Sequence, residues 1–445
     1  MSRYLNYLKQ SNIQAPIWMG IALAHVPFEM RPGIGKMYST QKHIIDKFKT
    51  IDSEQKRHFI FNQFFRVFKH AYINVPFYNK LYNDYGIHPD NICNFDDINK
   101  VPIVSKKDLI SVPIEDRSYP AKNRLLVNTG GSSGKAFSFY MDPIRYGNEW
   151  AHMHDIWAAY GYKPHSLKLS FDGRSNVKNY LSYDLVRNSL KFDIYADPKL
   201  TGAKLKDVIK RYDIEYLHGY PSAIYEFAQY CRDSNEGLLE KLRQTLKAVF
   251  LSSEYPSPFY RDYIEKVFGI PTQSFYGHTE TCVLAKEEEK FTYSVYQTYG
   301  YGEVFENDTG VINLIGTSYF NFASPLIRYN TEDAIEVVAE DRGVLDKFKI
   351  KEGRNGDYIL DSDHKRIPLT GLIFGRHHKL FDYCSHIQIR ENYPGNATVY
   401  YVPNSPIADD VQNLFDSNNI RITFEFVKLT KPILTKAGKV NLLVK

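Results

Sequence analysis

The segment whose residue types point most directly to chemistry is a short loop, Thr-Gly-Gly-Ser-Ser-Gly-Lys, at positions 129–135. Its glycines let backbone N–H groups approach a ligand closely. Its hydroxyls add donors and its lysine adds a positive charge, so the loop can bind an oligophosphate. A glycine-rich hairpin turn without a ligand has the same composition, and for the loop alone both interpretations stay open. The candidate phosphate-binding residues are Thr129, Gly130, Gly131, Ser132, Ser133, Gly134 and Lys135.

The spacing of this loop excludes a P-loop of the nucleotide-triphosphatase kind. Such a loop needs four residues between its first glycine and Gly-Lys, then Ser or Thr, and it opens a helix. Here three residues separate Gly130 from Gly134, and Ala136 follows the lysine. Strand-like patterns flank the loop at 125–127 and 136–142. We therefore predict a loop that joins two strands.

A second polar segment, Tyr-Gly-His-Thr-Glu at 276–280, follows a strand predicted at 273–275. The carboxyl end of such a strand is where open α/β sheets place their ligands. Thr279 can hydrogen-bond a phosphate oxygen, and Glu280 can hold Mg²⁺. Taken alone, the segment is equally consistent with a polar surface loop.

Three further groups are ones that a nucleotide could use. Asp333 is placed to accept hydrogen bonds from ribose hydroxyls, or to form a salt bridge with Arg328. Arg354 offers a guanidinium fork for ribose or phosphate, or belongs to a linker between domains. Lys439 follows a glycine turn near the end of the sequence, where most lysines are simply solvated.

Length and composition set the frame for these segments. A chain of 445 residues exceeds one compact core, which predicts two to three structural units. With 43% hydrophobic and 24% charged residues it has the composition of an ordinary globular protein. A net charge of +5 fits anionic substrates such as nucleotides and does not predict nucleic-acid binding.

Cysteine usage and the N-terminal segment bear on the compartment. The four cysteines form no CxxC pair and offer neither a zinc site nor a disulfide framework, so we expect a reducing cytoplasm. Residues 1–10 do not have the pattern of a signal peptide. The apolar run 15–26 is shorter than the ~20 residues of a membrane-spanning helix. It predicts a packed surface helix, with a peripheral membrane contact as the alternative.

Periodicity predicts the elements that position these groups. Residues 1–115 are mainly helical, with a helix over Phe48–Phe68, a break at Asn74–Tyr78 and another helix starting near Ser105. Helical and strand patterns then alternate from Leu205 to Phe275, which indicates parallel βαβ units.

After Gly300 the pattern changes to β-hairpins, and a glycine-containing polar segment at 351–356 predicts a hinge. We therefore expect an α/β fold: a large N-terminal domain with parallel-rich sheets, helices and a β-rich subdomain, followed by a small, mobile α+β C-terminal lid domain. The expected units are a helical N-terminal extension at 1–115, a core at 116–352 and the lid at 353–445.

The order of these motifs resembles that of the adenylate-forming ligases from about Asn74 to the end of the sequence. A glycine-rich hairpin, YGxTE, Arg-Tyr with an acid, GRxxD and Gly-Lys follow one another at similar relative positions. Within that superfamily the chain is most similar to the phenylacetate–CoA ligase branch, especially to CapK-like proteins of capsular polysaccharide clusters. The segments Asn74–Tyr78, Ile103–Lys106 and Thr317–Tyr329 support this branch, and 1–73 is similar with looser motifs.

The resemblance implies ATP and Mg²⁺ as cofactors. It implies that the loop at 129–135 holds the β- and γ-phosphates and that Tyr276, followed by Gly277, stacks on adenine. Thr279 and Glu280 correspond to the residues that serve phosphate and Mg²⁺, with Glu280 as the metal ligand.

The remaining motif residues also correspond to positions in the family. Asp333 matches the aspartate on the ribose hydroxyls, and Arg354 matches the arginine of GRxxD. Lys439 matches the lysine that bridges the carboxylate and the α-phosphate. The adenine-pocket segment corresponds to Ser253, Glu254 and Tyr255.

Four departures from the family pattern stand out. Ala136 replaces a proline, Glu332 stands where glycine often precedes Asp333, and Gly356 replaces a hinge acid. The segment Asp361–Arg366 replaces a glycine-rich turn that helps to admit the pantetheine arm of CoA. This last change counts against CoA as the acceptor.

The leading hypothesis is an ATP-dependent ligase that forms an acyl-adenylate and pyrophosphate, then passes the acyl group to an amine or hydroxyl of a sugar intermediate in capsule or O-antigen biosynthesis. An aryl- or acyl-CoA ligase is the first alternative. A non-catalytic nucleotide-binding protein of a surface-polymer assembly complex is the second. The presence of Lys439, Glu280 and Asp333 counts against the second.

The carboxylic acid itself is not identified by any motif, and none fixes an oligomeric state. Residues 171–173, 216–220 and 250–252 are candidates to line its pocket. His218 is either a polar contact of that pocket or a structural histidine.

Overall fold

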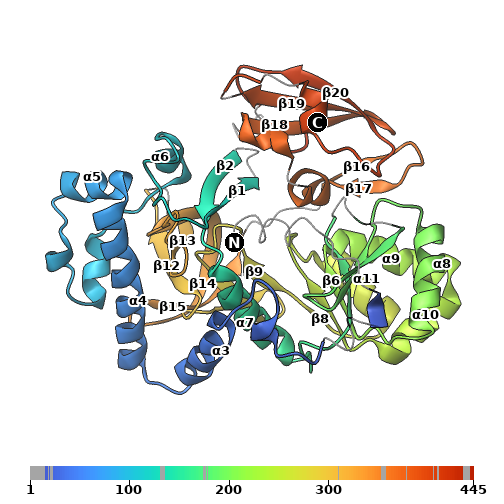
Figure 1. Cartoon of the computed structure of the whole chain (residues 1–445), viewed down its shortest axis with the longest axis horizontal. Coiled ribbons are helices and arrows are strands. Elements are labelled where there is room, and N and C mark those ends of the chain that lie inside the picture. Colours follow the sequence, from blue (N-terminus) through green and yellow to red (C-terminus); the bar gives the residue numbers. More distant parts are fainter. Residues whose placement is uncertain are drawn as a thin grey trace.

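The computed structural model of the chain describes residues 16–18, 20, 24–130, 136–173, 177, 179–308, 310–351, 357–376, 378–403, 405–407, 410–433 and 441–444. In it, two sheet-containing bodies lie side by side and the C-terminal strands lie above them (Figure 1).

Helices form the N-terminal segment as predicted. The longest, α4 (Ser53–Asn74), begins at a capping box between Asp52 and Gln55 and ends before Pro76 starts the next helix. Ser105 caps the helix predicted to follow it, with Asp108 completing a second capping box. The elements are η1 (Phe28–Met30), α3 (Met37–Phe48), α4, α5 (Pro76–Asp84), η2 (Pro89–Asn91), η3 (Phe95–Lys100) and α6 (Lys106–Ile110).

The phosphate-loop candidate is carried by a hairpin, as its flanking patterns predict. Strand β1 (Leu125–Gly130) pairs antiparallel with β2 (Ala136–Met141), and Gly130 lies opposite Ala136. Helix α7 (Arg145–Ala158) follows.

The predicted βαβ alternation forms a six-stranded sheet in the order β4-β5-β3-β6-β7-β8, parallel except for β4 at its edge. Four helices and one face of this sheet share a hydrophobic core. The strands are β3 (Lys168–Phe171), β4 (Leu181–Asp184), β5 (Ser189–Phe192), β6 (Tyr216–Gly219), β7 (Ala248–Leu251) and β8 (Thr272–Gln273). The helices are α8 (Pro198–Ile209), α9 (Pro221–Ser234), α10 (Glu236–Thr245) and α11 (Pro258–Phe268).

The predicted hairpins form a seven-stranded antiparallel sheet in the order β12-β13-β14-β15-β11-β10-β9. Its core is continuous with α4, α5 and the β1–β2 hairpin. The strands are β9 (Phe275–Gly277), β10 (Leu284–Glu289), β11 (Thr292–Val295), β12 (Gly300–Glu306), β13 (Ile312–Ser318), β14 (Tyr329–Asp341) and β15 (Val344–Ile350).

The single strand predicted at Gln273–Phe275 is wrong, because the chain changes sheets there. Gln273 still belongs to β8 of the parallel sheet, whereas Phe275 opens β9 of the antiparallel sheet. Between them Ser274 donates its N–H to the buried Glu287 carboxylate, 3.0 Å away. The Tyr276–Glu280 motif therefore begins on β9, an antiparallel edge strand, and does not follow a strand of the parallel sheet.

The C-terminal part has a three-stranded sheet, a two-stranded hairpin and short helical turns. It contacts both bodies: Asn128 of β1 donates to Asp382 at 2.7 Å, and Lys365 donates to the Ala196 carbonyl at 2.5 Å. The elements are β16 (Tyr358–Leu360), β17 (Arg366–Pro368), η4 (Thr370–Gly375), η5 (Lys379–Asp382), β18 (Cys384–Tyr393), β19 (Asn396–Pro403), α12 (Val411–Leu414) and β20 (Thr423–Lys428). The α/β class, with a parallel-rich sheet and a β-rich subdomain, is confirmed.

Two smaller findings bear on the expectations from composition. All four cysteines are unpaired. Among the described residues, no helix is both long enough and apolar enough to cross a membrane.

A buried arginine joins the helical N-terminal segment to the antiparallel sheet. Arg328 donates to both Glu303 oxygens at 2.9 Å and, through its other nitrogen, to backbone carbonyls of residues 98, 99 and 101. Burial raises the pKa of Glu303, although Arg328 opposes the rise. This pairing also removes one interpretation of Asp333, since Arg328 is committed to Glu303.

We expect Arg328→Met to lower the free energy of unfolding by about 3–5 kcal/mol, because it leaves the Glu303 charge buried without its partner. The double variant Arg328→Met/Glu303→Leu should recover most of the loss. Urea unfolding monitored by fluorescence measures both. Lys80→Met, which breaks the exposed pair with Asp84, is the control and should change stability by less than about 1 kcal/mol. Equal effects of the buried and exposed substitutions would contradict this role for Arg328.

Candidate functional site

The site is centred on a hydrogen bond between two motifs that are 151 positions apart in the sequence. Thr129, the first residue of the phosphate-loop candidate, donates its hydroxyl to Glu280 Oε1 at 3.1 Å. Thr129 lies on β1, and Glu280 lies in the turn after β9. The fold therefore brings together the start of the phosphate loop and the predicted metal ligand.

The other oxygen of Glu280 is held from within its own motif. His278 Nδ1 lies 3.2 Å from Glu280 Oε2, and the two side chains are each 13% exposed. Burial favours the neutral acid, but the interaction with His278, with help from Lys106, outweighs it and lowers the pKa of Glu280 below its ordinary range. Glu280 is thus a shielded but ionised carboxylate.

A tight turn exposes the neighbouring hydroxyl. The N–H of Thr281 donates to the His278 carbonyl at 3.1 Å, and Thr281 has the left-handed φ of 59°. Thr279 is exposed and directly precedes Glu280 in this turn. A hydroxyl and a carboxylate at one turn can serve a phosphate oxygen and its metal ion together.

A second long-range pair joins Tyr276 to Asp333. The tyrosine hydroxyl donates to Asp333 Oδ2 at 2.6 Å, and its ring meets Phe348 edge to face with centroids 5.4 Å apart. The Tyr276 side chain is 8% exposed. Burial and the Asp333 charge raise the pKa of Tyr276, so the hydroxyl stays a donor.

A bulge in β14 aims Asp333. Asn313 and Ile315 of β13 lie opposite Ala334 and Asn330, so the strand β14 carries extra residues at this point. Such bulges re-aim side chains. Glu332, within the bulge, has φ 62°, a conformation that favours glycine. The geometry explains why the resembled family often has glycine there.

The predicted adenine segment lies at the carboxyl end of β7. Ser253 has φ 68° and is exposed, and the Tyr255 ring stacks on Phe291 with centroids 5.9 Å apart. Glu254 is buried and accepts the N–H and hydroxyl of Ser222 in the first turn of α9, at 3.1 and 3.0 Å. A carboxylate is stabilised at a helix N-terminus. Glu254 thereby links the segment to α9.

Several predicted site residues lie outside the part of the chain that the structure describes. They are Gly131, Ser132, Ser133, Gly134, Lys135, Arg354 and Lys439. Their roles stay predictions.

The described residues fit Mg²⁺ that arrives with ATP. The described ranges contain no group of three His, Cys, Asp or Glu that could hold a metal ion. Mg²⁺ is usually bound through one or two carboxylates plus substrate phosphates and water. Glu280, ionised and adjacent to the phosphate-loop candidate, has the chemistry of such a ligand.

The segments expected to line the acid pocket do come together. Residues 171–173 and 250–252 lie at the carboxyl ends of β3 and β7, and residues 216–220 span β6, which lies between these two strands in the parallel sheet. The ring of His218 meets Trp157 at 5.2 Å, and burial lowers the pKa of His218 to about 4. His218 is therefore neutral, and its contact with substrate stays a prediction.

A buried lysine on the same face is not predicted by any sequence pattern. Lys168 is 2% exposed, with the rings of Trp150, Trp157 and Tyr162 within 6 Å of its ammonium group. It donates to Tyr162 Oη at 3.1 Å and to the Arg187 carbonyl at 2.8 Å. Burial lowers the pKa of Lys168 to about 7.

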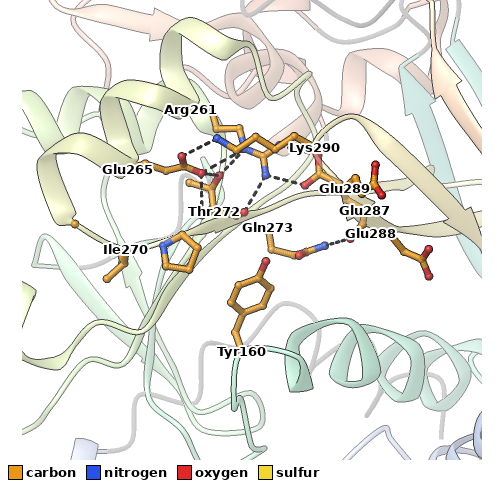
Figure 2. Close-up of a pocket in the computed structure, with 12 residues that line it drawn as sticks. Tyr160, Arg261, Glu265, Ile270, Thr272, Gln273, Glu287, Glu288, Glu289 and Lys290 are labelled. Carbon is orange, nitrogen blue, oxygen red and sulfur yellow. Dashed lines mark hydrogen bonds and ion pairs between the residues drawn. The ribbon is translucent and has the colours of Figure 1, made fainter.

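A pocket of about 480 Å³ lies away from these groups and is lined by none of the predicted site residues. Figure 2 shows Arg261 in its wall, between Thr272 and Glu287. Arg261 donates to both Glu287 oxygens, at 2.6 and 2.8 Å, and to the hydroxyl and carbonyl of Thr272. Glu287 also accepts two backbone N–H groups. These polar groups satisfy one another, so the wall is a junction between β8 and β10.

Two curated proteins are similar to the chain over most of its length. Protein CapK from Staphylococcus aureus is 27% identical over 345 residues, which are 73% of this chain and 74% of CapK. A phenylacetate-coenzyme A ligase from Pseudomonas putida is 23% identical over 322 residues, 66% of this chain and 69% of the ligase. No family model matches the chain.

Solved structures show the same fold. A crystal structure of 2-hydroxyisobutyryl-CoA ligase, in complex with 2-HIB-AMP and CoA in the thioesterification state, has a TM-score of 0.53 and 16% identity over 89% of this chain and 90% of that one. The same ligase in the postadenylation state has a TM-score of 0.50 and 17% identity, with the same coverage.

Replacement of Lys168 tests the effect of its burial. The pKa of Lys168 in the fold, about 7, lies below the ~10.4 of an unfolded chain, so the unfolded chain binds more protons between these values. The free energy of unfolding of the wild type therefore rises with pH in this window. We expect Lys168→Met to lack this rise, so that its stability relative to the wild type falls by about 2–3 kcal/mol from pH 6 to pH 9.

Urea unfolding at several pH values measures the difference, with Lys204→Met as the control at an exposed position. A difference between Lys168→Met and the wild type that does not change with pH would contradict the assigned pKa.

Proposed function

We propose that this chain acts as an adenylate-forming ligase on the branch of CapK and phenylacetate-coenzyme A ligase, to which it is similar over 73% and 66% of its length. As an adenylate-forming ligase it is an enzyme that converts ATP and a carboxylic acid into an acyl-adenylate and pyrophosphate. We propose that it then passes the acyl group to an amine or hydroxyl of a sugar intermediate, in the synthesis of a capsule or O-antigen polysaccharide.

The observation that carries the adenylation step is the ionised Glu280 carboxylate held against Thr129. In our proposal the loop at 129–135 binds the β- and γ-phosphates, and Thr279 donates to a phosphate oxygen. Mg²⁺, bound by Glu280 and the phosphates, would neutralise the charge that builds up when a carboxylate attacks an anionic phosphate.

The Tyr276–Asp333 pair supports a nucleoside site next to this carboxylate. Tyr276 orients Asp333 by donating to one of its oxygens. In our proposal Asp333 binds the ribose hydroxyls, Tyr276 and Gly277 border the adenine, and Ser253, Glu254 and Tyr255 line its pocket. A carboxylate already fixed in place loses little freedom when the ribose binds.

Lys439 and Arg354 complete the proposed site from the C-terminal lid domain, which we place at 353–445 after an N-terminal extension at 1–115 and a core at 116–352. Lys439 would bridge the substrate carboxylate and the α-phosphate, then leave with the lid and admit the acceptor.

An amine or hydroxyl acceptor is supported by the turn at Asp361–Arg366. The Asp361 carboxylate accepts the N–H groups of Asp363 and Lys365, both at 2.9 Å, and so closes the turn on itself. Lys365 reaches across to the Ala196 carbonyl, and burial lowers the pKa of Lys365 to about 8. Charged side chains thus stand where the resembled CoA ligases carry a glycine-rich turn.

CoA remains the competing acceptor, because several relatives on this branch are named as coenzyme A ligases. Incubation with ATP, an active acid and CoA distinguishes CoA from an amine or hydroxyl as the acceptor. Rapid thioester formation would overturn the amine or hydroxyl proposal and leave the adenylation step intact.

Pyrophosphate release over a panel of carboxylic acids, with hydroxylamine as the trap for acyl-adenylates, tests the adenylation step. We expect at least one acid to give ATP-dependent hydroxamate and ATP–pyrophosphate exchange. Binding of ATP without exchange with any acid would favour a non-catalytic nucleotide-binding protein of a surface-polymer assembly complex.

We expect Lys439→Ala to reduce ATP–pyrophosphate exchange by at least 100-fold while the Kd for ATP changes less than about threefold, because Lys439 acts on the transition state and not on bound nucleotide. Lys431→Ala, at an exposed lysine that precedes Lys439 in the sequence, is the control for charge loss in the same proposed domain. Equal loss of ATP binding and exchange would contradict this role.

A further inference from the structure

His278 occupies the variable position of the YGxTE motif, which by itself implies no role for it. Its ring has two hydrogen-bonded nitrogens in the structure. Nδ1 lies 3.2 Å from Glu280 Oε2, and Nε2 lies 3.2 Å from the backbone nitrogen of Val283. The two contacts lie on opposite sides of the ring, toward the carboxylate and toward the start of β10.

The Val283 contact fixes the tautomer. A backbone N–H only donates, so Nε2 of His278 must accept and cannot carry a proton. A neutral imidazole has one N–H, which is then on Nδ1. Nδ1–H therefore donates to Glu280, and neither ring nitrogen is left to bind a metal ion.

The carboxylate of Glu280 is consequently held at both ends. Oε2 accepts from His278, which is two residues away, and Oε1 accepts from Thr129 on the β1–β2 hairpin. One donor on each oxygen fixes the plane of the carboxylate and the direction in which it faces. Hydrogen bonds of this kind orient metal-binding carboxylates, and their loss costs 10–100-fold in metal affinity in typical sites.

We propose that His278 is a positioning residue that orients Glu280 for Mg²⁺, through a fixed Nδ1–H tautomer that Val283 sets. This inference rests on the proposed function, in which Glu280 is the metal ligand. His278 acts through Glu280 and touches neither the metal nor the substrate.

Two substitutions, each of which keeps one of the two hydrogen-bonding groups of the ring, distinguish a positioning role from a purely structural one. His278→Asn keeps an amide N–H where Nδ1–H stands and loses the acceptor for Val283. His278→Gln keeps an acceptor where Nε2 stands and loses the donor to Glu280. If His278 only caps the turn, His278→Asn should be the more harmful change. If His278 positions Glu280, His278→Gln should weaken Mn²⁺ binding more.

The test measures Mn²⁺ binding to the whole protein in the presence of α,β-methylene-ATP. The EPR signal of free Mn²⁺ reports how much of the metal remains unbound. We expect His278→Gln to raise the Kd for Mn²⁺ by about 10–100-fold and His278→Asn to raise it less than about threefold. Binding of a fluorescent ATP analogue in EDTA should be unchanged in both variants. If the His278→Gln variant binds Mn²⁺ as tightly as the wild type does, or if the His278→Asn variant binds it as weakly as the His278→Gln variant, the inference is overturned.

The Thr129 end gives an independent check should a His278 variant fail to fold. Thr129→Val removes the second donor and should weaken Mn²⁺ binding, while Thr129→Ser keeps the hydroxyl and should not. Equal Mn²⁺ affinity of the Val and Ser variants contradicts a carboxylate held from both oxygens.

Glu280→Gln distinguishes this inference from the proposed function. If Glu280→Gln leaves Mn²⁺ affinity unchanged, Glu280 is not the ligand, and the metal-binding part of the proposed function fails. If Glu280→Gln weakens Mn²⁺ binding and His278→Gln does not, only the positioning role is wrong.

Discussion

The Glu280 carboxylate accepts a hydrogen bond from Thr129 of the β1–β2 hairpin, and the proposed site depends on this contact. The hairpin carries the phosphate-loop candidate, and Glu280 follows the edge strand of the antiparallel sheet. An ionised carboxylate in a shielded place requires donors, and here it takes them from both segments. The proposed metal ligand and Thr129, the first residue of the phosphate-loop candidate, are thereby held against each other.

Buried arginines hold the frame in which this contact forms. Arg328 binds Glu303 of the antiparallel sheet and backbone carbonyls of the N-terminal helical segment, and so joins the two. Arg261 joins β8 to β10 through Thr272 and Glu287. Each arginine is hydrogen-bonded to a carboxylate and to backbone carbonyls, so that its charge is satisfied where water is excluded. Motion at the Arg261 junction would change the path of the chain into β9, because Ser274 donates to the same Glu287 carboxylate.

Much of the fold follows from local pattern. Helix α11 begins at Pro258 and ends at Phe268, before a left-handed Gly269, as expected from the helical period and a proline at the first turn. The strands of residues 168–192 were not predicted, because β3 and β5 are four-residue strands buried along their whole length. Without alternation, such short runs cannot be told from buried helix by pattern alone.

The sequence predicts the individual residues of the candidate site but not the hydrogen bonds between them. Sequence motifs named Thr129, Glu280, Tyr276 and Asp333, but the pairs they form are set by sheet register and by the bulge in β14. The role inferred for His278 depends on the Val283 N–H, which only the turn after β9 brings to its ring. A histidine two residues before a metal-binding carboxylate is the sequence signal that could have pointed to it.

The central claim is that this chain joins a carboxylate oxygen to the α-phosphorus of ATP. The most direct measurement uses an active carboxylic acid labelled with ¹⁸O in its carboxyl group and examines the AMP released after acyl transfer by mass spectrometry. The account predicts that AMP carries one ¹⁸O atom from the acid. Unlabelled AMP, or ADP with the label in inorganic phosphate, would contradict it.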